Sequence, residues 1–144
     1  MKVNKKYRFY KSYIQNAIFC FIIMGIFIFL SFLSKVYMIC FIPCSFICLV
    51  FLCVYIDRIA EAHRITKNPR SEGIVKHIEI TGYKYTFHIK YMEEDKEKHI
   101  ISIPFVLNRI TFDISIGKVQ KECLNKKVTF VVEDEQAYMM DIME

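Results

Sequence analysis

One apolar segment constrains the fold of this chain more than any other feature. Residues 17–56 contain a single charged residue, Lys35, whereas charged residues are frequent on both sides of the segment. A membrane-spanning helix needs about 20 apolar residues, so the segment has room for two spans. We expect helices over residues 14–33 and 36–56, separated at Ser34 and Lys35, because backbone polar groups in a bilayer must bond within a helix.

The distribution of Lys and Arg predicts the orientation of this hairpin. Basic residues cluster before the first helix and after the second, whereas the turn holds only Lys35. The positive-inside rule therefore predicts an inner-membrane protein with both termini in the cytoplasm, and the same side should hold an aromatic belt of Tyr7, Tyr10, Tyr13 and Tyr55. A cleaved signal peptide is the alternative for the first helix, but its apolar run is too long and no cleavage pattern follows it.

Small residues of the two helices are expected to form a packing seam. Three cysteines of the second helix are spaced four residues apart and form one stripe. Small residues favour close helix contacts in a membrane, so we expect a helix-packing seam of Cys20, Gly25, Cys40, Cys44 and Cys48. The alternatives are a metal site, for which a second ligand pair is missing, and disulfides, which a reducing cytoplasm disfavours.

Two further residues of the second helix have functional interpretations. Cys53 lies near the predicted cytoplasmic interface, where reversible acylation is an alternative to packing. Pro43 lies well inside the predicted helix, where it removes a backbone donor and is expected to cause a kink. This kink is either structural or a hinge.

The charge of the chain is divided between two parts. Residues 1–70 carry ten Lys and Arg against two Asp and Glu (+8), whereas residues 71–144 carry ten against thirteen (−3). The excess of positive charge therefore belongs to the membrane flanks and does not indicate a long nucleic acid as partner. We expect four regions: a basic cytosolic N-terminus over 1–13, the hairpin over 14–57, a juxtamembrane linker over 58–72 and a cytosolic domain over 73–144.

Alternation with period two predicts strands in this last region. Over residues 82–92, aromatic and aliphatic residues alternate with Lys, Thr and His. Residues 82–103 are expected to form a hairpin, and residues 118–125 two helical turns. Further strands are expected over 73–80, 126–135 and 137–142, and one around 109–116 that Gly117 closes. The predicted fold class is α+β: a transmembrane two-helix hairpin followed by a small antiparallel β domain of four to six strands.

One face of the central strand is basic and gives the candidate binding site. Lys84, His88 and Lys90 share this face, and Lys76 on the neighbouring strand can join it. Because adjacent strand residues point to opposite faces, only one of Lys76 and His77 is expected there. Such a face can bind phosphate groups; the alternative is a solvated outer surface. The sequence holds no P-loop, G-x-G-x-x-G, H-E-x-x-H or G-x-S-x-G motif, so we expect neither an enzyme, a cofactor nor a metal.

Several motifs of the β domain are similar to those of an uncharacterised family of small bacterial membrane proteins. The family's domain opens with a G-x-V strand, continues with an aromatic Y-x-F-x-x-x-Y strand and ends in a valine-rich strand, a turn and an alanine-containing strand. The matching residues are Gly73, Val75, Tyr85, Phe87, Tyr91, Val128 and Ala137. The usual Y-D-P turn is replaced by "VEDEQ". The resemblance implies the fold and a membrane location, and no function.

The sequence thus predicts a membrane-anchored binding module that forms homo-oligomers in the lipid bilayer. Its layout resembles that of two-helix membrane effectors of bacterial antiphage defence, which implies a signal-responsive protein whose cytosolic domain binds a small anionic nucleotide. Small two-helix immunity proteins have the same layout, and a passive membrane anchor is a third candidate. The main alternative is therefore an immunity or adaptor protein that binds another protein, with Pro104 near the contacting strand edge.

Overall fold

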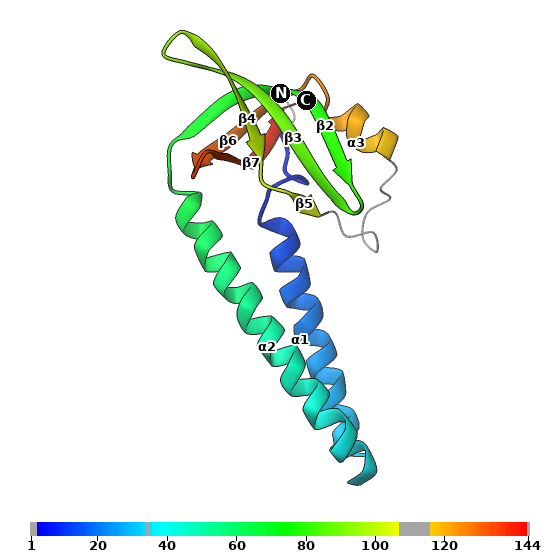
Figure 1. Ribbon diagram of the computed structural model, residues 1–144. Coiled ribbons are helices and arrows are strands. Elements are labelled where there is room, and N and C mark those ends of the chain that lie inside the picture. Colours follow the sequence, from blue (N-terminus) through cyan, green and yellow to red (C-terminus); the bar gives the residue numbers. More distant parts are fainter. Residues whose placement is uncertain (1–2, 34, 107–115, 144) are drawn as a thin grey trace. The chain divides into compact units, whose positions relative to one another are not determined.

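The computed structural model describes residues 3–33, 35–106 and 116–143 (Figure 1). Its contacts divide the chain into two compact units. One is the helical unit Ser12–His63, and the other combines Met1–Lys11 with Arg64–Glu144. The basic N-terminal segment, for which the sequence predicts a separate region, therefore belongs to the same unit as the β domain.

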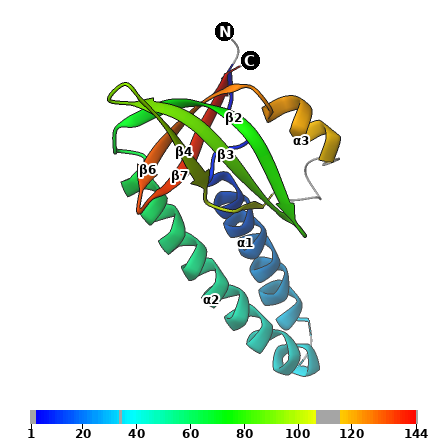
Figure 2. The ribbon, with the colours of Figure 1, turned by 45° about the horizontal axis from the view of Figure 1, so that its top comes forward.

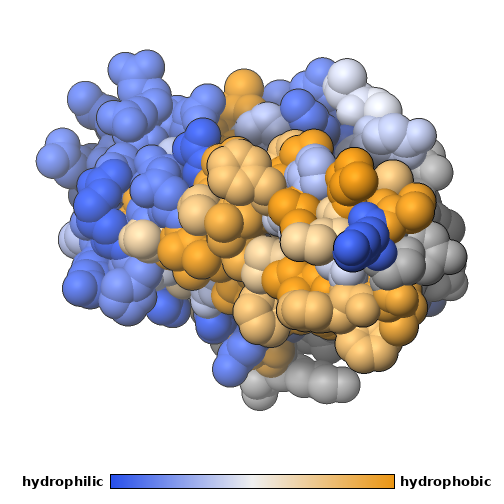
Figure 3. Space-filling view, turned by 90° about the horizontal axis from the view of Figure 1, so that it is seen from below, coloured by the Kyte–Doolittle hydropathy of each residue, from blue (hydrophilic) through white to orange (hydrophobic). Residues whose placement is uncertain are grey.

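The helical unit consists of α1 (Lys11–Ser31) and most of α2 (Lys35–Ile65). Both helices are long and apolar enough to cross a membrane, and their large apolar side chains remain exposed, as in Phe21 (63%) and Phe46 (64%). Figure 3 shows such side chains gathered in one broad hydrophobic surface. The two predicted helices are confirmed; α2 also continues past residue 56 and passes through Pro43 without interruption.

The β domain contains five long strands, two short ones and a short helix among its described residues. In chain order these are β1 (Val3–Asn4), β2 (Arg70–Thr81), β3 (Lys84–Glu93), β4 (Lys96–Ser102), β5 (Phe105–Val106), α3 (Ile116–Cys123), β6 (Lys127–Glu133) and β7 (Gln136–Met143). The predicted hairpin over residues 82–103 is confirmed as β3 and β4. The predicted strand around 109–116 lies mostly outside the described residues, but its closure at Gly117 is wrong, because Gly117 lies within α3.

The five long strands form a closed ring. Strand β2 pairs with β3, β3 with β4, β4 with β7, β7 with β6, and β6 again with β2. All these pairs are antiparallel except β4–β7, which is parallel and departs from the expected antiparallel arrangement. Figure 2 shows the strands curling round a common interior, with α3 beside the start of β6. The chain thus forms a three-stranded meander (β2, β3 and β4), then helix α3, then a hairpin (β6 and β7) that closes the barrel. This is the connectivity of an OB-fold barrel, which by itself implies no function.

Two acidic turns set the register of the long hairpins. The β3–β4 turn contains Glu94 and Asp95 at φ of 49° and 61°, and the β6–β7 turn contains Asp134 and Glu135 at 50° and 61°. Two consecutive positive φ values are typical of the two-residue turns whose twist matches that of the strands. The clusters of carboxylates in the sequence thus belong to solvated turns.

The interior of the barrel is filled by one face of each long strand. On β3 the predicted alternation is confirmed: Tyr85, Phe87, Ile89 and Tyr91 are buried, and the residues between them are exposed or half-buried. Helix α3 adds Val119 and Cys123, which are four residues apart and buried. Burial raises the pKa of the Cys123 thiol to about 12, so this cysteine stays protonated and inert at neutral pH.

The N-terminal segment completes this core. Tyr7 is fully buried, and its ring packs 6.2 Å from Phe87 and 5.9 Å from Phe105 between centroids. The prediction that Tyr7 lies at the lipid headgroups is therefore wrong. Arg8 binds the Asp141 carboxylate through Nε and Nη2, at 2.7 and 3.1 Å. The periodicity of a single segment cannot show that a distant sheet lacks one aromatic ring in its core.

Candidate functional site

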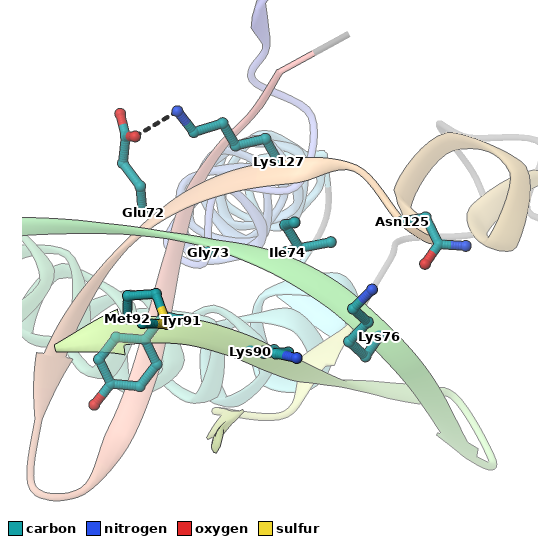
Figure 4. Close-up of a pocket in the computed structure, with 9 residues that line it drawn as sticks. All are labelled: Glu72, Gly73, Ile74, Lys76, Lys90, Tyr91, Met92, Asn125 and Lys127. Atoms are coloured by element: carbon teal, nitrogen blue, oxygen red, sulfur yellow. Dashed lines mark ion pairs between the residues drawn. The ribbon is translucent and has the colours of Figure 1, made fainter. Parts of the chain in front are cut away.

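A pocket of about 440 Å³ opens on the outer face of the β domain, over strand β2; we call it the β2 pocket. Strand β2 supplies its centre, β3 one side, and the turn before β6 together with β6 the other side (Figure 4). The lining residues are Glu72, Gly73, Ile74, Lys76, Lys90, Tyr91, Met92, Asn125 and Lys127. This volume is within the range of small-molecule sites.

Gly73 allows the strands around the β2 pocket to approach one another. At this residue β2 pairs with both neighbours, opposite Tyr91 of β3 and Val128 of β6. A Cβ atom here would lie 2.7 Å from both Ile89 Cγ2 and the Lys90 carbonyl oxygen. Only glycine therefore fits between the strands without a shift of the backbone.

A β-bulge directs Lys76 into the pocket. Val75 pairs with Ile89 and His77 with His88, so Lys76 is the extra residue of β2 at this point. Both Lys76 and His77 are consequently exposed. The prediction that only one of these two residues reaches the outer face is wrong, because it assumed an unbroken alternation.

Three lysines give the β2 pocket a positive rim, and carboxylates neutralise two of them. Lys127 forms an ion pair with Glu72 at 2.5 Å, and Lys90 forms one with Glu97, also at 2.5 Å. Lys76 forms no ion pair within the described part of the chain. In Figure 4, Lys76 and Lys90 extend from neighbouring strands toward the same part of the pocket. The arrangement suits a group with negative charge.

Apolar and amide groups accompany the lysines. Ile74 is 40% exposed and Met92 63% exposed, which gives the pocket two apolar surfaces. Asn125 adds an exposed amide that can donate and accept hydrogen bonds. The pocket can therefore contact a flat apolar group beside an anion.

The structure brings together two of the four predicted binding residues. Lys76 and Lys90 line the β2 pocket. His88 lies on the same outer face, with its ring centroid 5.3 Å from that of His77 and its Nε2 3.4 Å from Glu79. Lys84 pairs with Thr81 and Val106 at the opposite end of β3, about 20 Å from Lys90 for six strand residues.

Seven of the nine lining residues were not predicted as binding residues, and two of them, Asn125 and Lys127, come from the segment that leads into β6. Asn125 follows α3 with a φ of 58°, the left-handed conformation in which Asn commonly ends a helix. Lys127 begins the strand that follows. The run "LNKK" after a short helical segment indicates such a helix end, but it does not show that β6 returns to lie beside β2.

The predicted helix-packing residues differ in exposure. Cys20, Cys44 and Cys48 are partly buried, whereas Cys40 and Gly25 are exposed. The Sγ atom of Cys44 donates a hydrogen bond to the carbonyl oxygen of Cys40 at 3.4 Å, and all six cysteines are free. Within the described ranges, no group of three or more His, Cys, Asp and Glu side chains is arranged to hold a metal ion.

No protein-family model, curated protein or solved structure matches this chain. The resemblance to small bacterial membrane proteins therefore rests on the quoted motifs alone.

Proposed function

We propose that this chain is an integral membrane protein whose cytosolic β domain binds a small anionic ligand of the nucleotide type in the β2 pocket. The observation that carries the proposal is the position of Lys76. The bulge in β2 directs this lysine into a pocket beside Lys90 and Lys127, and it has no carboxylate partner among the described residues. A bound phosphate group would supply that partner.

The exposed apolar surface of α1 and α2 supports the membrane location. Large apolar side chains that are more than half exposed along both helices, such as Phe29 (65%) and Ile39 (77%), are unfavourable in water. A bilayer would cover them. The excess of Lys and Arg at the outer ends of the hairpin favours an orientation with the β domain in the cytoplasm.

The size and lining of the β2 pocket favour a mononucleotide-sized group over a long nucleic acid. Its volume of about 440 Å³ suits one nucleotide unit, for which Ile74 and Met92 offer apolar contact. Residues 71–144 carry a net charge of −3, which disfavours an extended polyanion.

The proposed role of the helices is to respond to this ligand. The layout resembles that of two-helix defence effectors, in which a cytosolic domain receives a signal and the membrane part acts. We expect homo-oligomers in the bilayer, in which the stripe of Cys44 and Cys48 repacks and Pro43 serves as the hinge.

The test is nucleotide binding by the full-length protein in nanodiscs of zwitterionic lipid. We expect AMP or GMP to bind, and Lys76→Gln or Lys90→Gln to weaken this binding at least tenfold by isothermal titration calorimetry. Lys84→Gln is the matched control, because it removes a lysine from the same face of β3 outside the pocket. Undiminished binding by both pocket variants would contradict the proposal.

A role in binding another protein is the second candidate function, and the observation that favours it is an edge of β4 that is unpaired in the described part of the chain. Strand β4 pairs with β3 from Lys96 to Ile101, but with β7 only at Ile101 and Ser102. The other edge of residues 96–100 therefore has no strand beside it among the described residues. Lys96 and Lys98 on this edge count against strand addition, because edge lysines disfavour it. Native mass spectrometry of the unchanged protein and of the variant His99→Pro, at an exposed residue of this edge, tests the second candidate function. A stoichiometric complex with another protein that the variant loses would favour protein binding.

A further inference from the structure

A second lysine-lined pocket lies on the other side of the turn that joins α3 to β6. This α3 pocket has a volume of about 380 Å³ and is lined by Lys118, Lys121, Glu122 and Lys126. Lys118 and Lys121 belong to α3, and Lys126 directly precedes β6. Within the described part of the chain, none of the three lysines forms an ion pair.

The single carboxylate of the α3 pocket is already neutralised. Glu122 accepts a hydrogen bond from the Tyr7 hydroxyl at 2.5 Å and forms an ion pair with Lys6 at 3.2 Å. Partners from the N-terminal segment thus bind this carboxylate, and the charge of Lys118 also acts on it. The three lysines remain as the available charges of the pocket.

The two pockets adjoin along three consecutive residues. Asn125 and Lys127 line the β2 pocket, whereas Lys126 between them lines the α3 pocket. Consecutive residues of the segment between α3 and β6 therefore contribute to both sites. Together they place six lysines around this segment, three in each pocket.

We propose that the α3 pocket is a second phosphate subsite, so that the ligand of this protein carries two phosphate groups, as a dinucleotide does. One phosphate would lie against Lys76, Lys90 and Lys127, and the other against Lys118, Lys121 and Lys126. The inference rests on the proposed function and extends it from a nucleotide to a ligand that spans both pockets. In the α3 pocket three lysines without ion pairs in the described ranges can compensate one phosphate group, whereas in the β2 pocket Lys76 supplies the unpaired charge, because Lys90 and Lys127 are paired with Glu97 and Glu72.

The test compares one-phosphate and two-phosphate probes on the full-length protein in zwitterionic nanodiscs. AMP and GMP are the one-phosphate probes, and the linear 5′-phosphorylated dinucleotides pApA and pGpG carry two. We expect one of the dinucleotides to bind at least tenfold more tightly than its mononucleotide. The variant Lys118→Gln/Lys121→Gln should weaken dinucleotide binding about tenfold and mononucleotide binding less than twofold, whereas Lys76→Gln should weaken both.

The outcomes separate the inference from the proposed function. Equal affinities for the two probe classes, with no effect of the α3 substitutions, would overturn the second subsite and leave the β2 pocket in place. Failure of all four probes to bind would overturn the proposed function itself. Lys126→Gln gives an independent check if the double variant lowers the melting temperature.

Anionic lipid headgroups offer the same phosphate chemistry, and a second arm distinguishes them. Vesicles with about one third phosphatidylglycerol should not displace the bound dinucleotide. If such vesicles displace it, and the α3 substitutions reduce binding to the vesicles alone, the lysines contact the membrane and the two-phosphate ligand is excluded.

Discussion

The hydroxyl of Tyr7 donates a hydrogen bond to the carboxylate of Glu122, a residue 115 positions away in the chain. Tyr7 lies four residues before α1 begins at Lys11, and Glu122 lies on α3 beside the lysines of the α3 pocket. The segment that leads into the first apolar helix is thus fastened to the candidate ligand site. A ligand that changes the surroundings of Glu122 would act on the anchor of that segment.

Removal of this hydroxyl should destabilise the β domain. Tyr7→Phe keeps the ring between Phe87 and Phe105 but leaves the partly buried Glu122 without one donor, at a cost of about 1–3 kcal/mol. Thermal unfolding followed by circular dichroism in detergent would measure the loss. Tyr83→Phe, at a ring that is 65% exposed, should cost less; an equal loss for both variants would show that the bond to Glu122 contributes little.

The same contact predicts that the stability of the β domain depends on pH in the acid range. Burial raises the pKa of Glu122, but the hydrogen bonds from Tyr7 and Lys6 and the charges of Lys6 and Lys118 outweigh it and hold the pKa below its ordinary value. Because the folded pKa is below the unfolded value of about 4.3, the stabilisation is present above that pH and is lost as pH falls through the folded pKa. The free energy of unfolding should therefore fall less steeply below about pH 4.3 in Glu122→Gln than in the unchanged protein. Identical slopes would be the contrary result.

The N-terminal segment should be required for folding of the β domain. A fragment of residues 64–144 lacks Tyr7 in the core and leaves Asp141, whose side chain is only 10% exposed, without its Arg8 partner. Loss of one charged partner costs about 2 kcal/mol before the cavity is counted. We expect poor dispersion in the amide spectrum of the fragment, restored by a peptide of residues 1–11. The same peptide with Tyr7→Ala and Arg8→Ala is the control and should fail to restore it.

Gly73→Ala should damage the fold and the β2 pocket together. The added Cβ would lie 2.7 Å from the Lys90 carbonyl oxygen, which is backbone and cannot rotate away. Overpacking of this kind costs about 1–3 kcal/mol, which thermal unfolding would detect. Gly117→Ala is the matched control, because its Cβ meets nothing within 4 Å and lies in a helix. A variant at Gly73 as stable as this control would contradict the close approach of β2 and β3.

Local patterns in the sequence were sufficient for most of the secondary structure. The alternation around Phe87 predicted β3 and its buried face, and the long apolar run predicted α1 and α2. These features depend on residues close together in the chain, where the period of the side chains fixes which face is apolar. Lys90 was correctly placed on the outer face of β3 for the same reason.

The tertiary structure alone decided which residues meet. The bulge at Lys76, the return of β6 beside β2 that brings in Asn125 and Lys127, and the insertion of Tyr7 into the core all depend on pairing between segments far apart in the chain. Such pairing is set by how five curved strands close into one ring and by which side chain fills the remaining space. The sequence by itself determined the elements and their apolar faces; the closure of the barrel determined the candidate site.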